Sequence, residues 1–156
     1  MAQIHAESAC KSDAVSFVGA QGLAQFMPPT AADMARNFSE CSPADPFNAG
    51  WSIRCKDLYM RQLLRSTKPY AAGLDACSQW VFALRAYNGG GGWVNRDRRK
   101  ARDAGVNPDN WVEVQPFNAG RRASAFHENT EYPLRILKIQ LRYIAAGWGA
   151  GVCQSG

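Results

Sequence analysis

The sequence predicts a mostly helical fold in a single domain covering residues 1–156. Three segments place apolar residues three or four positions apart, which is the spacing of one helix face. No stretch alternates apolar and polar residues for long enough to indicate a sheet. At 156 residues, the chain has the length of one domain that can bury a core.

The N-terminal part predicts two short helices. Ala2 to about Ala9 contains helix-forming residues and no breaker, so we expect the first helix there. A short apolar piece, Leu23 to Met27, ends at a pair of prolines. Thr30 then has the character of an N-cap, with Asp33 three residues later nearly completing a capping box. The second helix should therefore run from Ala31 to about Asn37.

Three stronger amphipathic patterns follow a loop marked by Pro43, Asp45, Pro46 and Gly50. They predict helices from Ile53 onward, from Leu74 to Tyr87 and from Glu128 to Ala146. Their apolar positions are Ile53, Leu58, Tyr59, Leu63 and Leu64 in the first, Leu74, Cys77, Trp80, Val81, Leu84 and Tyr87 in the second, and Leu134, Leu137, Leu141 and Ile144 in the third. Asn88 and the glycines 89–92 should end the second helix.

The chain is basic, with 18 Lys and Arg against 13 Asp and Glu and a net charge of +5. Such a balance suits an anionic partner: nucleic acid, an acidic membrane surface or a negatively charged polysaccharide. Five basic residues form a run, which we interpret as a solvated helical face, with a polyanion-attracting patch as the alternative. They are Arg96, Arg98, Arg99, Lys100 and Arg102. No nucleic-acid motif accompanies them, and no nucleic-acid partner is expected.

Neither a membrane segment nor a signal peptide is predicted. The sequence contains no run of about 18 apolar residues and opens on no basic-then-apolar leader. The five cysteines are Cys10, Cys41, Cys55, Cys77 and Cys153. They have no zinc-like spacing, so we expect either one or two disulfides in an oxidising compartment or buried free thiols. A Cys41–Cys55 bond would close a short loop, but the sequence leaves the pairing open.

Glu7 is a candidate general acid from its surroundings alone. It lies in an apolar-leaning helix with small neighbours, and a carboxyl held against apolar walls has a raised pKa and can stay protonated. Most glutamates in helices are simply solvated, so Glu7 by itself is weak evidence for catalysis and has to be judged together with the sequence around it.

That context consists of ordered short blocks. Glu7-Ser8 is followed by Ala14-Val15-Ser16, then by residues 19–28 (GAQGLAQFMP), then by Thr30-Ala31. The series resembles the signature of soluble lytic transglycosylases, the goose-type-lysozyme-like enzymes that cleave peptidoglycan: E-S, A-x-S, G-A-x-G-L-M-Q, M-P-x-T-A. Ala24 stands where the family usually has Met.

Later blocks extend the resemblance over most of the chain. Residues 86–89 (AYNG) resemble the family's A-Y-N-x-G block, and residues 45–64 are similar to the helix that packs behind its site. Residues 128–132 (ENTEY) resemble the E-T-x-x-Y block loosely. The resemblance implies a lysozyme-like fold with a substrate groove beside the Glu7 helix, no cofactor and no metal.

The resemblance also implies a chemistry in which Glu7 is the single acid/base. Glu7 would protonate the oxygen between N-acetylmuramic acid and N-acetylglucosamine, and would then take the proton of the muramic C6 hydroxyl as it closes a 1,6-anhydro ring. No water is consumed. Hydrolytic glycosidases use a second carboxylate, and the matched blocks contain no obvious one.

Other roles follow from position in the matched blocks. Ser16 would hold substrate or the Glu7 carboxyl, while Gln25 and the backbone around Phe26 and Met27 would line the groove and engage N-acetyl groups. The Tyr87 hydroxyl would orient Glu7, Asn88 would hold its turn, and Glu128 would bind sugar. Gly19 and Gly22 would let the chain turn close to the sugar. Each has a plainer alternative: Ser16 as a turn residue, Tyr87 as core, Gln25 as a surface amide, and Asn88 as part of a helix end.

Two other functions remain open. In a muramidase, Asp13 or Asp33 would activate water and hydrolyse the same bond. A non-catalytic peptidoglycan-binding domain would keep the groove. His5-Ala6-Glu7 echoes half of a zinc deaminase motif, but the P-C-x-x-C half is missing. His5 and His127 are the only histidines, so no metal site is expected.

The biological setting is predicted only in outline. The small size and basic charge suit a monomeric phage or prophage endolysin that acts on peptidoglycan strands in the periplasm or cell wall. A housekeeping periplasmic enzyme, or one that opens the wall for a secretion machine, would use the same chemistry. Only six residues precede Glu7, so we expect a trimmed catalytic domain or a lost opening helix. Residues 9–12 also depart from the family's usual aromatic-plus-Pro continuation.

Overall fold

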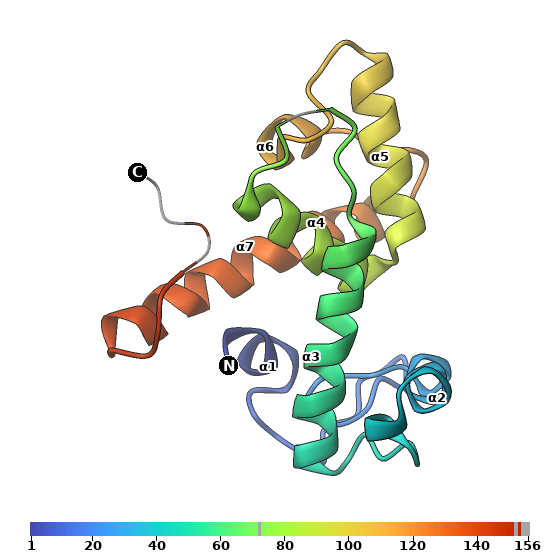
Figure 1. The fold of residues 1–156 in the computed structure, drawn as a ribbon, viewed down its shortest axis with the longest axis vertical. Helices are drawn as coiled ribbons and strands as arrows, with labels where there is room; N and C mark the ends of the chain where they lie inside the picture. Colours follow the sequence, from blue (N-terminus) through green and yellow to red (C-terminus); the bar gives the residue numbers. More distant parts are fainter. Residues whose placement is uncertain (72, 152, 154–156) are drawn as a thin grey trace. The chain divides into compact units, whose positions relative to one another are not determined.

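The computed structural model describes residues 1–71, 73–151 and 153, and over this range the chain is mostly helical, as predicted (Figure 1). The helices are α1 (Ala2–Ser8), α2 (Pro28–Asn37), the 3₁₀ helix η1 (Ser39–Cys41), α3 (Ala49–Ser66), α4 (Ala76–Gly89), α5 (Gly91–Asp103), α6 (Trp111–Val114) and α7 (Ala123–Ala145). No strand forms among the described residues, and isolated β-bridges pair Gln21 with Val15 and with Phe26. The chain forms two compact units, Met1–Arg61 and Gln62–Gly156.

Helix α2 begins earlier than predicted. Its N-cap is Met27, and prolines occupy its first turn. A proline fits there because its missing N–H would have had no partner within the helix. Thr30 is therefore not the N-cap, and the predicted capping box is wrong. Asp33 instead pairs with Arg36 on the surface of the helix.

The core of the first unit is built around Phe26. Its ring meets Trp51 edge-on with centroids 5.3 Å apart and lies 6.2 Å from Tyr59. Cys41 and Cys55 form a disulfide beside this cluster, as the sequence allowed, and the Trp51 indole N–H donates to the Cys41 carbonyl at 2.7 Å. The disulfide thus joins η1 to α3 at the aromatic cluster.

Helix α3 buries a different face from the one predicted. The buried positions Trp51, Cys55 and Met60 set the inward stripe, while Ile53 is 49% exposed. Ile53 lies two residues from both Trp51 and Cys55, which at helical periodicity is nearly the opposite face. The prediction that Ile53 belongs to the core was wrong. It took Ile53 as the first apolar position of the helix, whereas α3 begins at Ala49 and Trp51 is its first buried apolar residue.

In the second unit, α4 packs against α5, α6 and α7 (Figure 1). Residues 81–84 and 86 of α4 are all buried, and residues of the other three helices surround them. They include Val94 and Ala101 of α5, Val114 of α6, and Tyr132 and Ile136 of α7.

A second disulfide joins Cys77 to Cys153 in this unit. Cys10, in the first unit, is a free, exposed thiol.

The basic run on α5 is not wholly solvated, contrary to the interpretation of the sequence. Arg98 is 1% exposed, and its guanidinium lies over the rings of Phe82 and Tyr70, at 4.6 and 4.7 Å. It bonds to Asp109 at 2.5 Å and to the Pro108 carbonyl at 2.8 Å. Arg96, Arg99, Lys100 and Arg102 do remain exposed.

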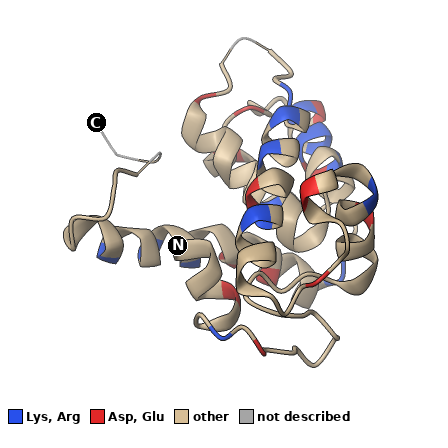
Figure 2. Ribbon diagram, turned by 60° about the horizontal axis from the view of Figure 1, so that its bottom comes forward, with Lys and Arg blue, Asp and Glu red and all other residues tan. Residues whose placement is uncertain are grey.

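Helix α7 starts at Ala123, five residues before the predicted Glu128, and includes Pro133. Basic residues recur along it at Arg135, Lys138 and Arg142, so they share one face of the helix (Figure 2). Along the described part of the chain, no helix combines the length and apolar character needed to cross a membrane.

Asp75 caps α4, and its replacement by alanine should lower the free energy of unfolding by about 1 kcal/mol. Its carboxylate accepts from the Ser78 N–H at 2.8 Å and the Ser78 hydroxyl at 2.6 Å, and these bonds hold its pKa below the ordinary value. The stabilisation is therefore present above the unfolded-state pKa, about 4, and is lost as pH falls through the folded-state pKa. Urea denaturation at pH 7 and pH 3 checks this. Asp57→Ala, which removes an exposed carboxylate, is the control. An equal loss for Asp75→Ala at both pH values would contradict it.

Candidate active site

Glu7 lies on the last turn of α1 in the first unit and is half-buried. The helix ends at once, because Ala9 and Cys10 have left-handed backbone angles, with φ of 51° and 64°. The Ser8 hydroxyl donates to the Leu23 carbonyl at 2.9 Å. The Glu-Ser block is thereby joined to the glycine-rich loop of residues 14–26.

Two of the predicted site residues hold that loop in shape. The Ser16 hydroxyl accepts from the Ala20 N–H, and the Ser16 N–H donates to the Ala20 carbonyl, both at 2.9 Å. The Gln25 side-chain amide donates to the carbonyls of Gly22 at 2.9 Å and Ala14 at 3.2 Å. Ser16 thus bonds within a turn, and Gln25 braces the loop from inside, while their predicted contacts with substrate stay predictions.

Gly22 makes a close approach that no other residue could. A Cβ there would lie 1.7 Å from the Pro46 carbonyl oxygen, and the backbone φ is +72°. That oxygen also accepts from the Ser52 hydroxyl at 2.7 Å, so the loop rests on the turn that leads into α3. Around Gly19, by contrast, a Cβ would meet nothing within 4 Å.

Phe26 and Met27 differ in exposure. The Phe26 side chain is 2% exposed and belongs to the core, and its N–H and carbonyl both pair with Gln21. Met27 is 40% exposed. The loop also presents Phe17 fully to solvent, with Val15 and Val18 exposed beside it.

Tyr87, Asn88 and Gly89 form the C-terminal end of α4 in the second unit. Gly90, with φ of 89°, ends the helix within the predicted glycine run. The run is shorter as a breaker than predicted, because α5 begins at Gly91. A Cβ on Gly89 would lie 2.5 Å from the Asn129 side-chain nitrogen. The glycine thus lets α7 approach the end of α4.

Asn129 connects the end of α4 to a buried charged cluster. Its amide nitrogen donates to the Arg85 carbonyl at 2.7 Å and to the Asn88 side-chain oxygen at 3.1 Å. Its amide oxygen accepts from Arg85 at 3.1 Å and from Arg121 at 2.7 Å. Both ends of this buried amide are satisfied, which fixes the Asn88 side chain.

Asp97 lies between two guanidinium groups in the same cluster. It pairs with Arg85 at 2.9 Å and with Arg121, and it accepts from the Ala119 N–H at 2.9 Å. Burial raises the pKa of Asp97, against the opposing effects of that N–H and of both arginines. Burial also lowers the pKa of Arg85 to about 10. Two arginines thus share one carboxylate, which leaves the cluster with one more basic group than acidic groups.

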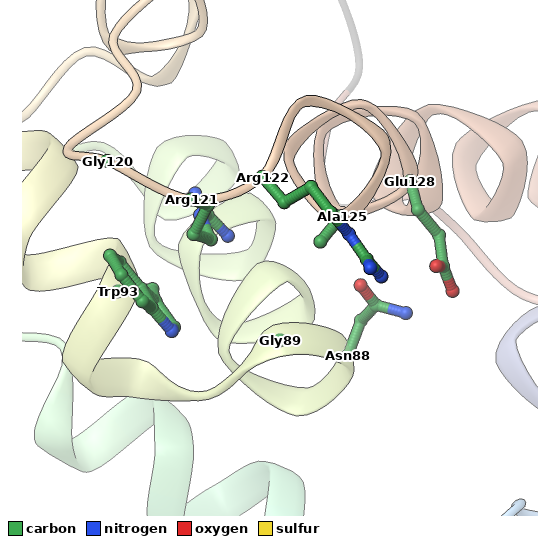
Figure 3. Close-up of a pocket in the computed structure, with 8 residues that line it drawn as sticks. All are labelled: Asn88, Gly89, Trp93, Gly120, Arg121, Arg122, Ala125 and Glu128. Carbon is green, nitrogen blue, oxygen red and sulfur yellow. The ribbon is translucent and has the colours of Figure 1, made fainter. Parts of the chain in front are cut away.

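A pocket of about 370 Å³ borders this cluster at Arg121 (Figure 3). It is lined by Asn88, Gly89, Trp93, Gly120, Arg121, Arg122, Ala125 and Glu128. The Asn88 amide, the Arg122 guanidinium and the Glu128 carboxylate extend toward one another (Figure 3). The structure thus brings two predicted site residues, Asn88 and Glu128, to one pocket.

Sequence reasoning missed several residues of this site. Trp93, Arg121 and Arg122 line the pocket, and Asn129 supports it, but none lies in a block that carries chemistry by itself. Asn129 falls within the loose ENTEY block, which offered a signal only for Glu128. A second hollow, of about 500 Å³, follows α7 past Glu128 to Lys138.

The other predicted candidates lie apart from these features. Asp13 is exposed in the loop after α1, and Asp33 is exposed and paired with Arg36. Within the described residues, no group of three or more His, Cys, Asp or Glu side chains is arranged to hold a metal ion.

Comparison with known proteins assigns the family. The family described as "Transglycosylase SLT domain" matches residues 1–110, a range that includes Glu7, the loop of residues 14–26 and Asn88. The chain belongs to this family. The resemblance found in the sequence and the prediction of a mostly helical, lysozyme-like fold are therefore confirmed.

One curated relative is "Membrane-bound lytic murein transglycosylase F" of Aeromonas hydrophila subsp. hydrophila. It is 31% identical over 126 residues, which make up 81% of this chain and 23% of the relative. The chain thus spans about a quarter of the length of that protein.

Proposed function

We propose that this chain is a peptidoglycan lytic transglycosylase domain that cleaves the β-1,4 bond between N-acetylmuramic acid and N-acetylglucosamine. The observation that carries the proposal is the placement of Glu7. It lies half-buried at the end of α1, and the Ser8 side chain bonds this helix end to the loop of residues 14–26. In that loop, Gly22 approaches the Pro46 carbonyl more closely than a residue with a Cβ could. Glu7 and the loop both fall inside the region matched by the family.

In the proposed reaction, Glu7 serves first as acid and then as base. Its carboxyl gives a proton to the glycosidic oxygen, the bond from C1 to that oxygen breaks, and positive charge develops on the muramic ring. The muramic C6 hydroxyl attacks C1 and returns its proton to the Glu7 carboxylate. The products are a free N-acetylglucosamine 4-hydroxyl and a 1,6-anhydromuramic end, with no water consumed.

In this proposal, some of the remaining predicted residues shape the loop and others contact the substrate. Ser16, Gln25 and Phe26 act through the shape of the loop, because their polar groups bond within it. Met27, exposed at the start of α2, is the residue of this stretch available for direct contact with substrate. Asn88 and Glu128 contact substrate through the pocket, and Tyr87 belongs to the site by its place in the AYNG block.

Mass spectrometry of muropeptides released from purified peptidoglycan tests the function. We expect products lighter by one water than hydrolytic ones, with no reducible muramic end. Reducible ends would favour the muramidase alternative, although the exposed Asp13 and the paired Asp33 offer it little support. If nothing is released, the chain is either a binding domain or a fragment without the family's opening helix.

The proposed site of action is the bacterial cell wall, within the periplasm. Two disulfides suit an oxidising compartment. The lack of nucleic-acid partners, the monomeric state and the endolysin role stay predictions.

A further inference from the structure

Three basic side chains form a stripe along the second half of α7. Arg135, Lys138 and Arg142 recur at intervals of three and four residues, which places them on one face of the helix (Figure 2). All three are exposed, and none forms an ion pair or hydrogen bond with a residue that the structure describes. Residues 132–156 contain no Asp or Glu, so the stripe supplies three of the five net positive charges of the chain. The stripe therefore presents concentrated positive charge to solvent.

Apolar side chains lie on both sides of this basic stripe. Successive residues of a helix are rotated by about 100°, so Leu141 and Tyr143 lie on opposite sides of Arg142. Leu141 is 64% exposed and continues a row with Leu134 and Leu137, which are half-buried. Exposed charge and exposed apolar surface thus occur together on this half of α7.

Trp148 extends the apolar surface just beyond the end of the helix, and the backbone holds it in place. Gly147 has a φ of 81° and donates its N–H to the Ile144 carbonyl, while the Trp148 N–H donates to the Tyr143 carbonyl, both at 2.9 Å. These bonds form a Schellman motif. The Trp148 ring meets the Tyr143 ring edge-on with centroids 6.5 Å apart, yet Trp148 stays 66% exposed. The motif therefore fixes an aromatic side chain in solvent beside the basic stripe.

The combination of these features indicates the kind of partner. Positive charge alone would suit any polyanion, and exposed apolar side chains alone would suit another protein. Both together suit the surface of a bilayer that contains anionic lipids. Lys and Arg there meet the lipid phosphates, and Leu enters the boundary between headgroups and acyl chains. Trp is favoured at the same depth, because its ring is apolar and its indole N–H keeps a polar partner.

We propose that the second half of α7, together with Trp148, is a docking surface for an anionic lipid bilayer. Arg135, Lys138 and Arg142 contact the headgroups, while Leu141 and Trp148 enter the interface beside them. The helix lies on the bilayer in this arrangement and does not cross it. The surface goes beyond the proposed function, because it concerns where the chain acts and not which bond it cleaves.

Flotation of the full chain with lipid vesicles tests the surface. One set of vesicles contains phosphatidylcholine alone, and the other contains one-third phosphatidylglycerol. We expect the chain to float with the anionic vesicles and to be released from them at high salt. Combining Arg135→Gln, Lys138→Gln and Arg142→Gln should weaken this binding about 100-fold, or about fivefold for each basic residue removed.

A matched variant separates the stripe from net charge. Combining Arg99→Gln, Lys100→Gln and Arg102→Gln removes the same charge from exposed positions of α5 in the same unit. This variant should bind the anionic vesicles within about fivefold of the unmodified chain. Equal losses for the α5 and α7 variants would mean diffuse attraction of a basic protein and would overturn the docking surface, as would a failure of the unmodified chain to bind anionic vesicles.

The apolar part of the surface has its own test. Leu141→Gln keeps a helix-forming residue and should weaken vesicle binding about tenfold. Val112→Gln, at an exposed apolar position of α6, should leave it unchanged. Tryptophan emission should shift to shorter wavelength when anionic vesicles are added, and Trp148→Phe should remove that shift.

A second copy of the chain is the competing occupant of this surface. Sedimentation equilibrium of the unmodified chain and of Leu141→Gln distinguishes it from a bilayer. Unchanged vesicle binding by Leu141→Gln, or a dimer that this variant alone disrupts, would overturn the lipid surface. Because the vesicles contain no peptidoglycan, each of these results is independent of whether the chain cleaves glycan strands.

Discussion

Replacing Glu7 with glutamine is expected to slow the formation of 1,6-anhydro ends by about 10³-fold or more. Glutamine has nearly the same shape as glutamate but carries no transferable acid proton. In the proposed reaction one carboxyl acts in both bond breaking and ring closure, so the substitution affects two proton transfers. The measurement is the initial rate of anhydro product formation on purified peptidoglycan, with thermal unfolding followed alongside.

A matched variant separates this effect from a general loss of carboxylates. Glu40→Gln changes an exposed glutamate of η1 in the same unit, and it should keep the activity of the unmodified chain. If Glu7→Gln stays folded and within tenfold of the unmodified rate, another group is the acid. If it loses activity and also unfolds, Glu7→Asp provides the second test. Its shortened carboxyl should retain a small measurable rate.

Helices α3, α4 and α7 could be predicted from sequence because their apolar faces are long and regular, whereas the short η1 and α6 were not predicted. The failures occurred where another interaction outweighed the local pattern. Thr30 is a good N-cap by composition, but prolines occupy the first turn of α2 and move its start to Pro28. Ile53 is apolar, but Trp51 and the disulfide-bonded Cys55 decide which face of α3 is buried.

Some residues of the candidate site could likewise be predicted from local sequence and others could not. Glu7 and Asn88 could be named as candidates because each stands in a block whose order and spacing are specific. Trp93, Arg121 and Arg122 come together only when α5 and α7 pack around the end of α4, and no local pattern records that packing. Asp97 was hidden for the opposite reason, because its basic neighbours made the whole segment resemble a solvated helix face.

Replacing Asp97 with asparagine should lower the free energy of unfolding by about 3–5 kcal/mol, the usual range when one partner of a buried ion pair is removed. Asparagine fills the same space and keeps an acceptor for the Ala119 N–H, but it leaves Arg85 and Arg121 buried without a counter-charge. Asp57→Asn, which weakens an exposed i,i+4 pair with Arg61, should cost about 0.5 kcal/mol or less.

Urea denaturation of Asp97→Asn and Asp57→Asn measures the difference between their losses of unfolding free energy. We also expect the two variants to respond differently to salt. Because Asp97→Asn increases the excess positive charge beside an open pocket, sulfate should recover more stability in Asp97→Asn than in Asp57→Asn. Equal losses in the two variants would mean that water or a neighbouring group already neutralises the arginines. The excess positive charge assigned to the cluster of Arg85, Arg121 and Asp97 would then be absent.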